Sequence, residues 1–116
     1  MENTQSSDEI LLCSEAEIGE NCLVQAIAHD VRILLCRIDG EVHALDGICP
    51  HRGASLSQGQ CMQKAVVCPC HNWAFDLTTG QGITNPHSSL KKYPVFIKEG
   101  NVLINASSLE SGSKIE

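Results

Sequence analysis

Two short segments of the sequence combine a cysteine with a histidine. Cys49-Pro50-His51 places a thiol and an imidazole close together, and Cys68-Pro69-Cys70-His71 does the same further along the chain, after sixteen intervening residues. Within each short loop the thiolate and the imidazole can point to one centre, and the prolines stiffen the loops. The two segments therefore predict one metal centre with four ligands: Cys49, His51, Cys68 and His71.

Two thiolates and two imidazoles suit two kinds of metal centre. In a binuclear [2Fe–2S] cluster, the cysteines Cys49 and Cys68 would hold one iron and the histidines His51 and His71 the other. A structural zinc ion would use the same four side chains as a tetrahedron. Zinc fingers, however, usually pair two cysteines in one loop and two histidines on a helix, whereas each loop here mixes the two residue types. The spacing therefore favours a single [2Fe–2S] cluster over zinc.

The composition limits the class of protein. At 116 residues the chain is long enough for one hydrophobic core. Its formal charge of −6, with only eight scattered Lys and Arg residues, argues against nucleic-acid binding and favours protein partners with basic docking surfaces. Seven cysteines are many for a cytoplasmic protein, in which cysteine clusters bind metals more often than they form disulfides.

The sequence shows neither a secretory signal nor a membrane span. Residues 1–9 are polar and acidic, and no apolar run approaches the length that crosses a bilayer. We therefore expect a cytoplasmic protein that does not bind membranes. Because no segment has an obvious self-pairing pattern, we expect a monomer.

Short apolar runs separated by turn residues predict strands. The expected strands are residues 10–13, 22–28, 31–38, 41–45, 65–67, 73–76, 95–98 and 102–105. Asp39-Gly40 and Glu99-Gly100-Asn101 are hairpin signals, because glycine tolerates a positive φ. Ser14 to Glu17 form a capping-box pattern, but Gly19 follows too soon for more than one helical turn. The chain is therefore predicted to be all-β, with antiparallel outer strands.

The ends of the chain differ in composition from its middle. Residues 1–9 and 106–116 are rich in Ser, Glu and Gly, so we expect flexible tails on either side of one folded domain at residues 10–105. Residues 46–82 contain four of the seven cysteines and two of the five histidines. We expect the metal-binding part of the domain there.

The residues around both ligand pairs resemble the two motifs of the Rieske family of [2Fe–2S] proteins. The resemblance rests on residues 49–56, 68–76, 79–80, 85–86 and 90–95. It spans about residues 10–105 and is similar to the stand-alone ferredoxins of bacterial multicomponent oxygenases. The pattern His71-x-Trp73-x-Phe75, with Gly80-x-Gly82-Ile83, is most similar to the toluene monooxygenase ferredoxin. Asn72 departs from the family, which usually has glycine there.

This resemblance implies a fold and a function. The fold is an antiparallel β-sandwich base with a small inserted cluster-binding subdomain, and both imidazoles lie near the surface at one tip. The function is that of a one-electron carrier, without catalytic residues of its own, between an NADH-dependent flavin reductase and a terminal oxygenase. The alternative within the family is the small Rieske subunit of an NAD(P)H-dependent nitrite reductase.

The resemblance also bears on residues beside the cluster. High-potential relatives have a disulfide cysteine at the position of Cys70, but its partner position here is Ala54, so we expect a free thiol. We expect the other non-ligand cysteines to be small buried hydrophobes: Cys13, Cys22, Cys36 and Cys61. High-potential relatives also have a Ser and a Tyr that donate hydrogen bonds to the cluster sulfurs. Trp73 and Phe75 stand there, so we expect a low reduction potential and mainly a packing role for both rings.

Overall fold

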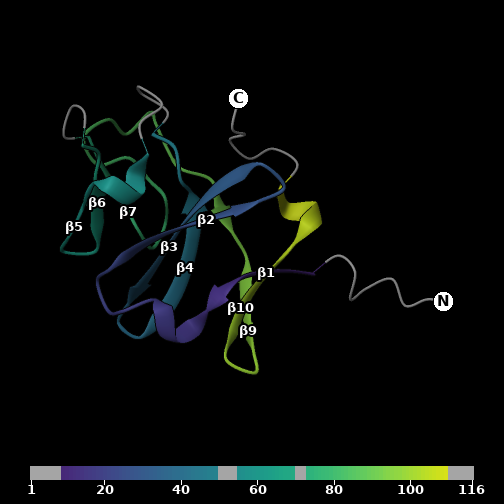
Figure 1. Cartoon of the computed structure of the whole chain (residues 1–116). Coiled ribbons are helices and arrows are strands. Elements are labelled where there is room, and N and C mark those ends of the chain that lie inside the picture. Colours follow the sequence, from purple (N-terminus) through teal and green to yellow (C-terminus); the bar gives the residue numbers. More distant parts are fainter. Residues whose placement is uncertain (1–8, 50–54, 70–72, 110–116) are drawn as a thin grey trace.

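The computed structural model describes residues 9–49, 55–69 and 73–109, which form three antiparallel sheets and no α-helix (Figure 1). The first sheet has the order β1 (Glu9–Ser14), β10 (Asn101–Asn105) and β9 (Val95–Lys98). The second has the order β2 (Leu23–Ala28), β3 (Val31–Ile38), β4 (Glu41–Asp46) and β8 (Lys92–Tyr93). The third contains β5 (Gln60–Met62), β6 (Ala65–Val67) and β7 (Ala74–Asp76). Within these residues, no helix is long and apolar enough to cross a membrane.

The predicted all-β fold is confirmed. Each of the eight predicted strands is present, with ends within one residue of those expected. The short strands β5 and β8 were missed. The described residues also contain three 3-10 helices: η1 (Glu15–Glu17) and η2 (Leu56–Gln58) lie between strands, and η3 (Ala106–Leu109) follows β10. The predicted capping box forms in η1, where Glu17 Oε2 accepts from the Ser14 N–H (3.2 Å) and Ser14 Oγ accepts from the Ala16 N–H (3.4 Å).

Four hairpins of the described residues have two-residue turns in which both residues have a positive φ. The predicted turns Asp39-Gly40 (φ 54° and 82°) and Glu99-Gly100 (54° and 79°) contain glycine. Two further turns, His29-Asp30 (47° and 66°) and Gln63-Lys64 (51° and 67°), do not. Such turns match the twist of a hairpin, but each non-glycine residue in this region costs about 1 kcal/mol. Sequence patterns that depend on glycine therefore miss the hairpin of β5 and β6.

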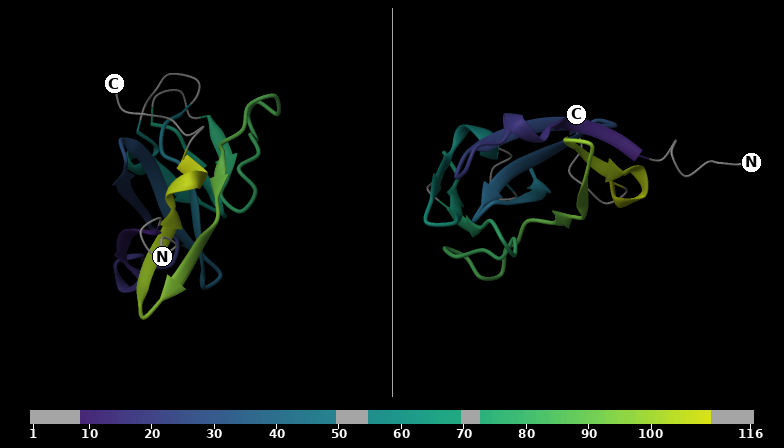
Figure 2. Two further views of the ribbon diagram at one scale, coloured as in Figure 1. Left: turned by 90° about the vertical axis from the view of Figure 1, so that its right-hand side faces the viewer. Right: turned by 90° about the horizontal axis from the view of Figure 1, so that it is seen from below.

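The second sheet is the middle layer of the molecule, because β3 is buried on both faces. Val31, Ile33 and Leu35 point into the sandwich core between the first two sheets, whereas Leu34 and Cys36 point to the third sheet. The sandwich core contains Ile18, Ala26, Ala28, Val31, Ile33, Leu35, Ala44, Tyr93, Val102, Ile104 and Leu109. The subdomain core contains Leu34, Cys36, Ile38, Leu45, Cys49, Leu56, Val66, Cys68, Phe75, Leu77 and Leu90. Figures 1 and 2 show the first and third sheets on opposite sides of the second.

The folded part of the chain extends further than the predicted domain at both ends. Glu9 pairs with Asn105, and its carboxylate lies 3.3 Å from Lys98 Nζ. At the other end, η3 buries Leu109, a single large apolar residue in a stretch whose polar composition suggested a tail. Residues 1–8 and 110–116 lie outside the described residues, and their assignment to tails stays a prediction.

Candidate metal centre

The first ligand loop leaves the second sheet where β4 ends. The Gly47 N–H donates to the Arg32 carbonyl of β3 (3.0 Å), and the Gly47 carbonyl accepts from the Leu56 N–H (2.9 Å). Ile48 and Ser55, the neighbours of Gly47 and Leu56 in the chain, form an antiparallel bridge. These contacts join the two ends of the loop, so the chain that contains Cys49 and His51 starts and ends at the same place.

The second ligand loop is the connection between β6 and β7. Val67 and Ala74 form the last pair of the two strands, and the Cys68 N–H donates to the Trp73 carbonyl (2.7 Å). Cys68 is therefore held by the strand ladder, and the segment that contains His71 spans the gap between two hydrogen-bonded neighbours.

The two loops lie against each other at Gly59, which follows η2. A Cβ atom on Gly59 would be only 2.0 Å from the Val67 carbonyl oxygen, so the backbone of the first loop's exit touches the backbone that leads into Cys68. Only glycine permits this approach. Cys49 and Cys68 are both fully buried (0% exposed) in the subdomain core. The structure thus brings together the two cysteines of the predicted ligand set.

The histidines of the predicted set, His51 and His71, lie outside the described residues, as do Ala54, Cys70 and Asn72. Among the residues that are described, no group of three Cys, His, Asp or Glu side chains could hold a metal ion. Two buried thiols provide half of a four-ligand set. The other donors would have to come from the segments that leave the same two loop ends, and these contain the two histidines. The donor chemistry therefore fits a [2Fe–2S] cluster with mixed ligands.

Aromatic side chains close the subdomain core on the side of the second loop. Phe75 is fully buried (0% exposed) and pairs with Val66 across β6 and β7, while Trp73 is half-buried against the same core. This confirms the predicted packing role for both rings. The two rings belong to the same core as Cys49 and Cys68, whose buried thiols are not exposed to solvent.

A tight turn after β7 returns the chain to the base. The Asp76 carboxylate accepts from Thr78 Oγ1 (2.6 Å) and from the N–H groups of Thr78 (2.7 Å) and Thr79 (3.1 Å). These hydrogen bonds, with that of the Thr78 hydroxyl the strongest, lower the pKa of Asp76. Gly80 ends the turn at φ 83°. The Thr79-Gly80 pair of the family resemblance is thus a structural turn.

The cysteines without ligand spacing differ in their burial. Cys36 is buried as predicted, and this burial raises the pKa of its thiol to about 12. Cys13 and Cys61 are half-buried, which also raises their pKa. The prediction was wrong for Cys22, which is exposed. Its N–H donates to the Gly19 carbonyl (3.1 Å) in a turn, so β2 begins one residue later than the apolar run suggested.

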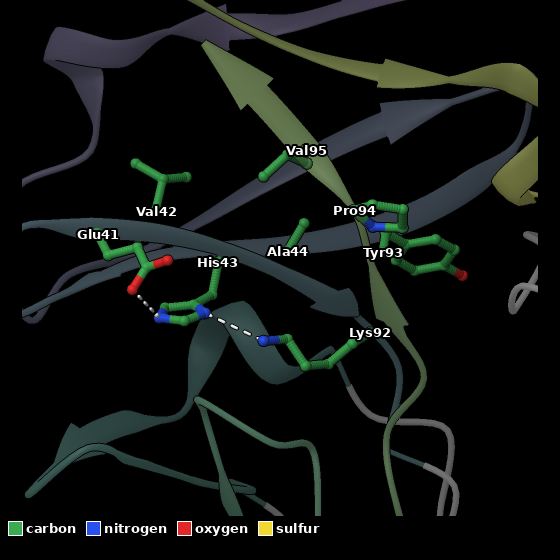
Figure 3. A pocket seen from close by; sticks show the side chains of 8 residues that line it. All are labelled: Glu41, Val42, His43, Ala44, Lys92, Tyr93, Pro94 and Val95. Atoms are coloured by element: carbon green, nitrogen blue, oxygen red, sulfur yellow. Dashed lines mark hydrogen bonds and ion pairs between the residues drawn. The ribbon is translucent and has the colours of Figure 1, made fainter.

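A pocket of about 350 Å³ lies between β4 and the segment of β8 and β9 (Figure 3). In it, Lys92 Nζ lies 3.1 Å from His43 Nδ1 and donates to the Thr78 carbonyl (2.6 Å). Burial and the Lys92 charge lower the pKa of His43, so its neutral form accepts from the ammonium group. Lys92 therefore links β4 to the turn after β7. No cysteine is among the described residues that line this pocket, so the pocket is separate from the proposed metal centre.

Comparison with known proteins decides the family. Residues 8–94 match the Rieske [2Fe-2S] domain. The chain belongs to the Rieske family. The family assignment selects one [2Fe–2S] cluster as the cofactor and sets the zinc alternative aside.

The Rieske chain is similar to carriers from several bacterial systems. It is 38% identical over 92 residues to the ferredoxin component of the alkene monooxygenase system of Xanthobacter autotrophicus, covering 78% of this chain and 74% of that protein. A ferredoxin of Sphingomonas yanoikuyae superposes with a TM-score of 0.78 at 30% identity, covering 84% and 97% of the two chains. A Mycobacterium tuberculosis protein assigned as the small subunit of an NADH-dependent nitrite reductase superposes with a TM-score of 0.74 at 26% identity, covering 83% and 92%. The finer likeness to a toluene monooxygenase ferredoxin stays a prediction.

Proposed function

We propose that this chain is a Rieske ferredoxin that passes single electrons from an NADH-dependent flavin reductase to a terminal oxygenase, and that it is not itself a catalyst. The main observation is that Cys49 and Cys68, at the ends of two adjoining loops, are both fully buried in the same core. A bound [2Fe–2S] cluster supplies one-electron redox chemistry. The carrier is proposed to act as a cytoplasmic monomer.

The two proposed cysteine ligands are buried, and the two proposed histidine ligands would be the ones accessible to a partner protein. Cys49 and Cys68 would hold one iron inside the subdomain core, where Leu56 and Phe75 exclude water. His51 and His71 would hold the other iron from the segments beyond the loop ends. Because the rate of electron tunnelling falls steeply with distance, a partner has to dock close to the segments that contain His51 and His71. No substrate pocket is needed for this function.

The similarity to the alkene monooxygenase component supports an oxygenase as the electron acceptor. The solved nitrite reductase subunit has the same fold at lower sequence identity, so the alternative function is a second candidate. The two differ in the acceptor. With a flavin reductase and NADH, we expect the chain to support turnover of a terminal oxygenase and not of a sirohaem-type nitrite reductase large subunit. The reverse result would favour the alternative.

Metal analysis of single variants tests the proposed ligands. The purified chain should contain two irons and two acid-labile sulfides, with the visible spectrum of a Rieske cluster. Cys49→Ser, His51→Ala, Cys68→Ser and His71→Ala should each abolish the cluster. Cys61→Ser is the matched control, because Cys61 contacts the same core without ligand spacing. Bound zinc without sulfide would refute the proposal, and cluster loss in the control would refute the ligand assignment.

A further inference from the structure

A buried tyrosine is hydrogen-bonded to the residue from which the first ligand loop starts. Tyr93 is 2% exposed, and its ring lies in the sandwich core. Its hydroxyl donates to Asp46 Oδ1 at 2.6 Å. Burial and the Asp46 carboxylate raise the pKa of Tyr93, so the phenol keeps its proton and acts as the donor. The contact is a short hydrogen bond to a charged acceptor, which is the stronger kind.

Asp46 is the last residue of β4, and the segment that contains β8 holds it at two points. The Asp46 N–H donates to the Lys91 carbonyl (2.9 Å), and the Asp46 carboxylate accepts from Tyr93. The next residue, Gly47, turns away to bond Arg32 and Leu56, and Cys49 follows two positions later. Asp46 therefore sets the place and direction from which the chain runs to Cys49.

Asp46 is paired with Ile33 of β3, but the main-chain contact between β4 and β8 is short. β8 has only two residues and pairs with β4 only at Ala44 and Leu45. After Tyr93, Pro94 has no N–H to donate to the ladder, and β9 belongs to the first sheet, with β1 and β10. The side-chain bond from Tyr93 to Asp46 therefore adds a contact at the end of a short ladder, directly before the ligand loop.

We infer that Tyr93 is a positioning residue for the cluster, acting through Asp46 on the loop that contains Cys49. The inference rests on the proposed role of Cys49 as an iron ligand. Metal sites tolerate deviations of only about 0.2 Å in ligand distances, so a small loosening at the loop base weakens ligation. The phenol does not need to touch the cluster to have this effect.

Tyr93→Phe removes the hydroxyl and keeps the ring in the sandwich core. We expect the oxidised, cluster-loaded variant to release iron to a chelator about tenfold faster than the wild type, because tenfold corresponds to about 1.4 kcal/mol, near the lower end for a net hydrogen bond to a charged group. In an Asp46→Ala background, adding Tyr93→Phe should change the rate by less than about twofold. A similar acceleration in both backgrounds would overturn the inference, because Tyr93 would then not act through Asp46.

Arg37→Met is a control for general loss of stability. Arg37 donates from Nε to the Ile18 carbonyl (2.7 Å) and from its terminal nitrogen to the Glu15 carbonyl (2.9 Å), at the other end of β3 from the ligand loop. We expect this variant to unfold more easily but to release iron at the wild-type rate. If both variants release iron faster in proportion to their loss of stability, Tyr93 has only a structural role.

Hydrogen exchange separates this inference from the proposed function, because it does not require a cluster. Tyr93→Phe should speed amide exchange at Gly47 and Leu56, whose N–H groups close the loop base, and Arg37→Met should not. A chain without iron and sulfide would refute the proposed function, while the exchange at these two amides would still test the role of Tyr93. Wild-type exchange in Tyr93→Phe would overturn it.

Discussion

A methyl group at Gly59 is expected to force the two ligand loops apart. The Cβ of Gly59→Ala would lie 2.0 Å from the Val67 carbonyl oxygen and 3.1 Å from the Val67 carbonyl carbon. Because real Cβ contacts essentially never fall below 3.0 Å, one of the two backbones has to move by about 1 Å. Val67 is the last residue of β6 and directly precedes Cys68, so the displacement reaches a proposed iron ligand.

The size of this movement decides the expected result. Gly59 has φ −84°, which alanine adopts without strain, so the effect is purely steric. A shift of about 1 Å is several times the tolerance of about 0.2 Å in metal–ligand distances. Overpacking of this kind also costs roughly 1–3 kcal/mol of folding stability. We therefore expect Gly59→Ala to fold with reduced stability and to lose most of its cluster.

Gly100→Ala is the matched control for this substitution. Gly100 has φ 79° and nothing within 4 Å of an added Cβ, so alanine there costs about 1 kcal/mol through backbone conformation alone. Iron and sulfide content, the visible spectrum and denaturant unfolding of both variants are compared. Gly100→Ala should lose stability and keep its cluster. If Gly59→Ala keeps a full cluster at wild-type stability, the contact between the loops does not fix Cys68, and the reasoning is wrong.

Two further predictions concern His43 and Phe75. Because burial and Lys92 lower the pKa of His43, the unfolded state takes up a proton below about pH 6.5 that the folded state resists, so stability should fall as the pH drops, by at most about 1.4 kcal/mol per pH unit. His43→Asn should flatten this fall in denaturant unfolding between roughly pH 5 and pH 7; an unchanged slope would show that another group is responsible. Phe75→Tyr adds a hydroxyl in the core that contains both thiols, and we expect voltammetry to show a raised reduction potential, as hydrogen bonds to the sulfurs raise it. An unchanged potential with lower stability would mean that the ring edge points away from the cluster.

Sequence patterns predicted those parts of the fold that depend on local chemistry. The apolar runs located the longer strands, and the glycine-containing turns located two hairpins. β5 was missed because its sequence Gln-Cys-Met is not a clear apolar run, unlike the equally short Ala-Val-Val of β6, and β8 was missed because two residues form no pattern. The assignment of residues 106–109 to a tail failed because composition averages over a segment, whereas one apolar side chain, Leu109, is enough to dock it.

The placement of Cys49 and Cys68 in one core was predictable for a different reason, while the full ligand set stays a prediction. Cysteine and histidine at short spacing have few structural explanations, so Cys49 and Cys68 could be paired before any fold was known. The residues that place them had no such pattern. In the sequence Gly59 looks like an ordinary turn glycine, and only its contact with Val67 of β6 shows why glycine is needed there. Tyr93 is separated from Asp46 by 47 positions in the chain. Close backbone approach and long-range hydrogen bonds are properties of the tertiary structure alone.

The two-sided burial of β3 explains why the ligand loops depend on the whole domain. Among the described residues between 47 and 82, the strands β5, β6 and β7 have three residues each, too few to enclose a core by themselves. Leu34, Cys36 and Ile38 of β3 complete the core around Cys49 and Cys68, while Val31, Ile33 and Leu35 of the same strand fix β3 to the first sheet. The cluster-binding part is thus one side of a strand whose other side belongs to the sandwich. This shared strand gives the thiols of Cys49 and Cys68 a support that the short third sheet could not provide by itself.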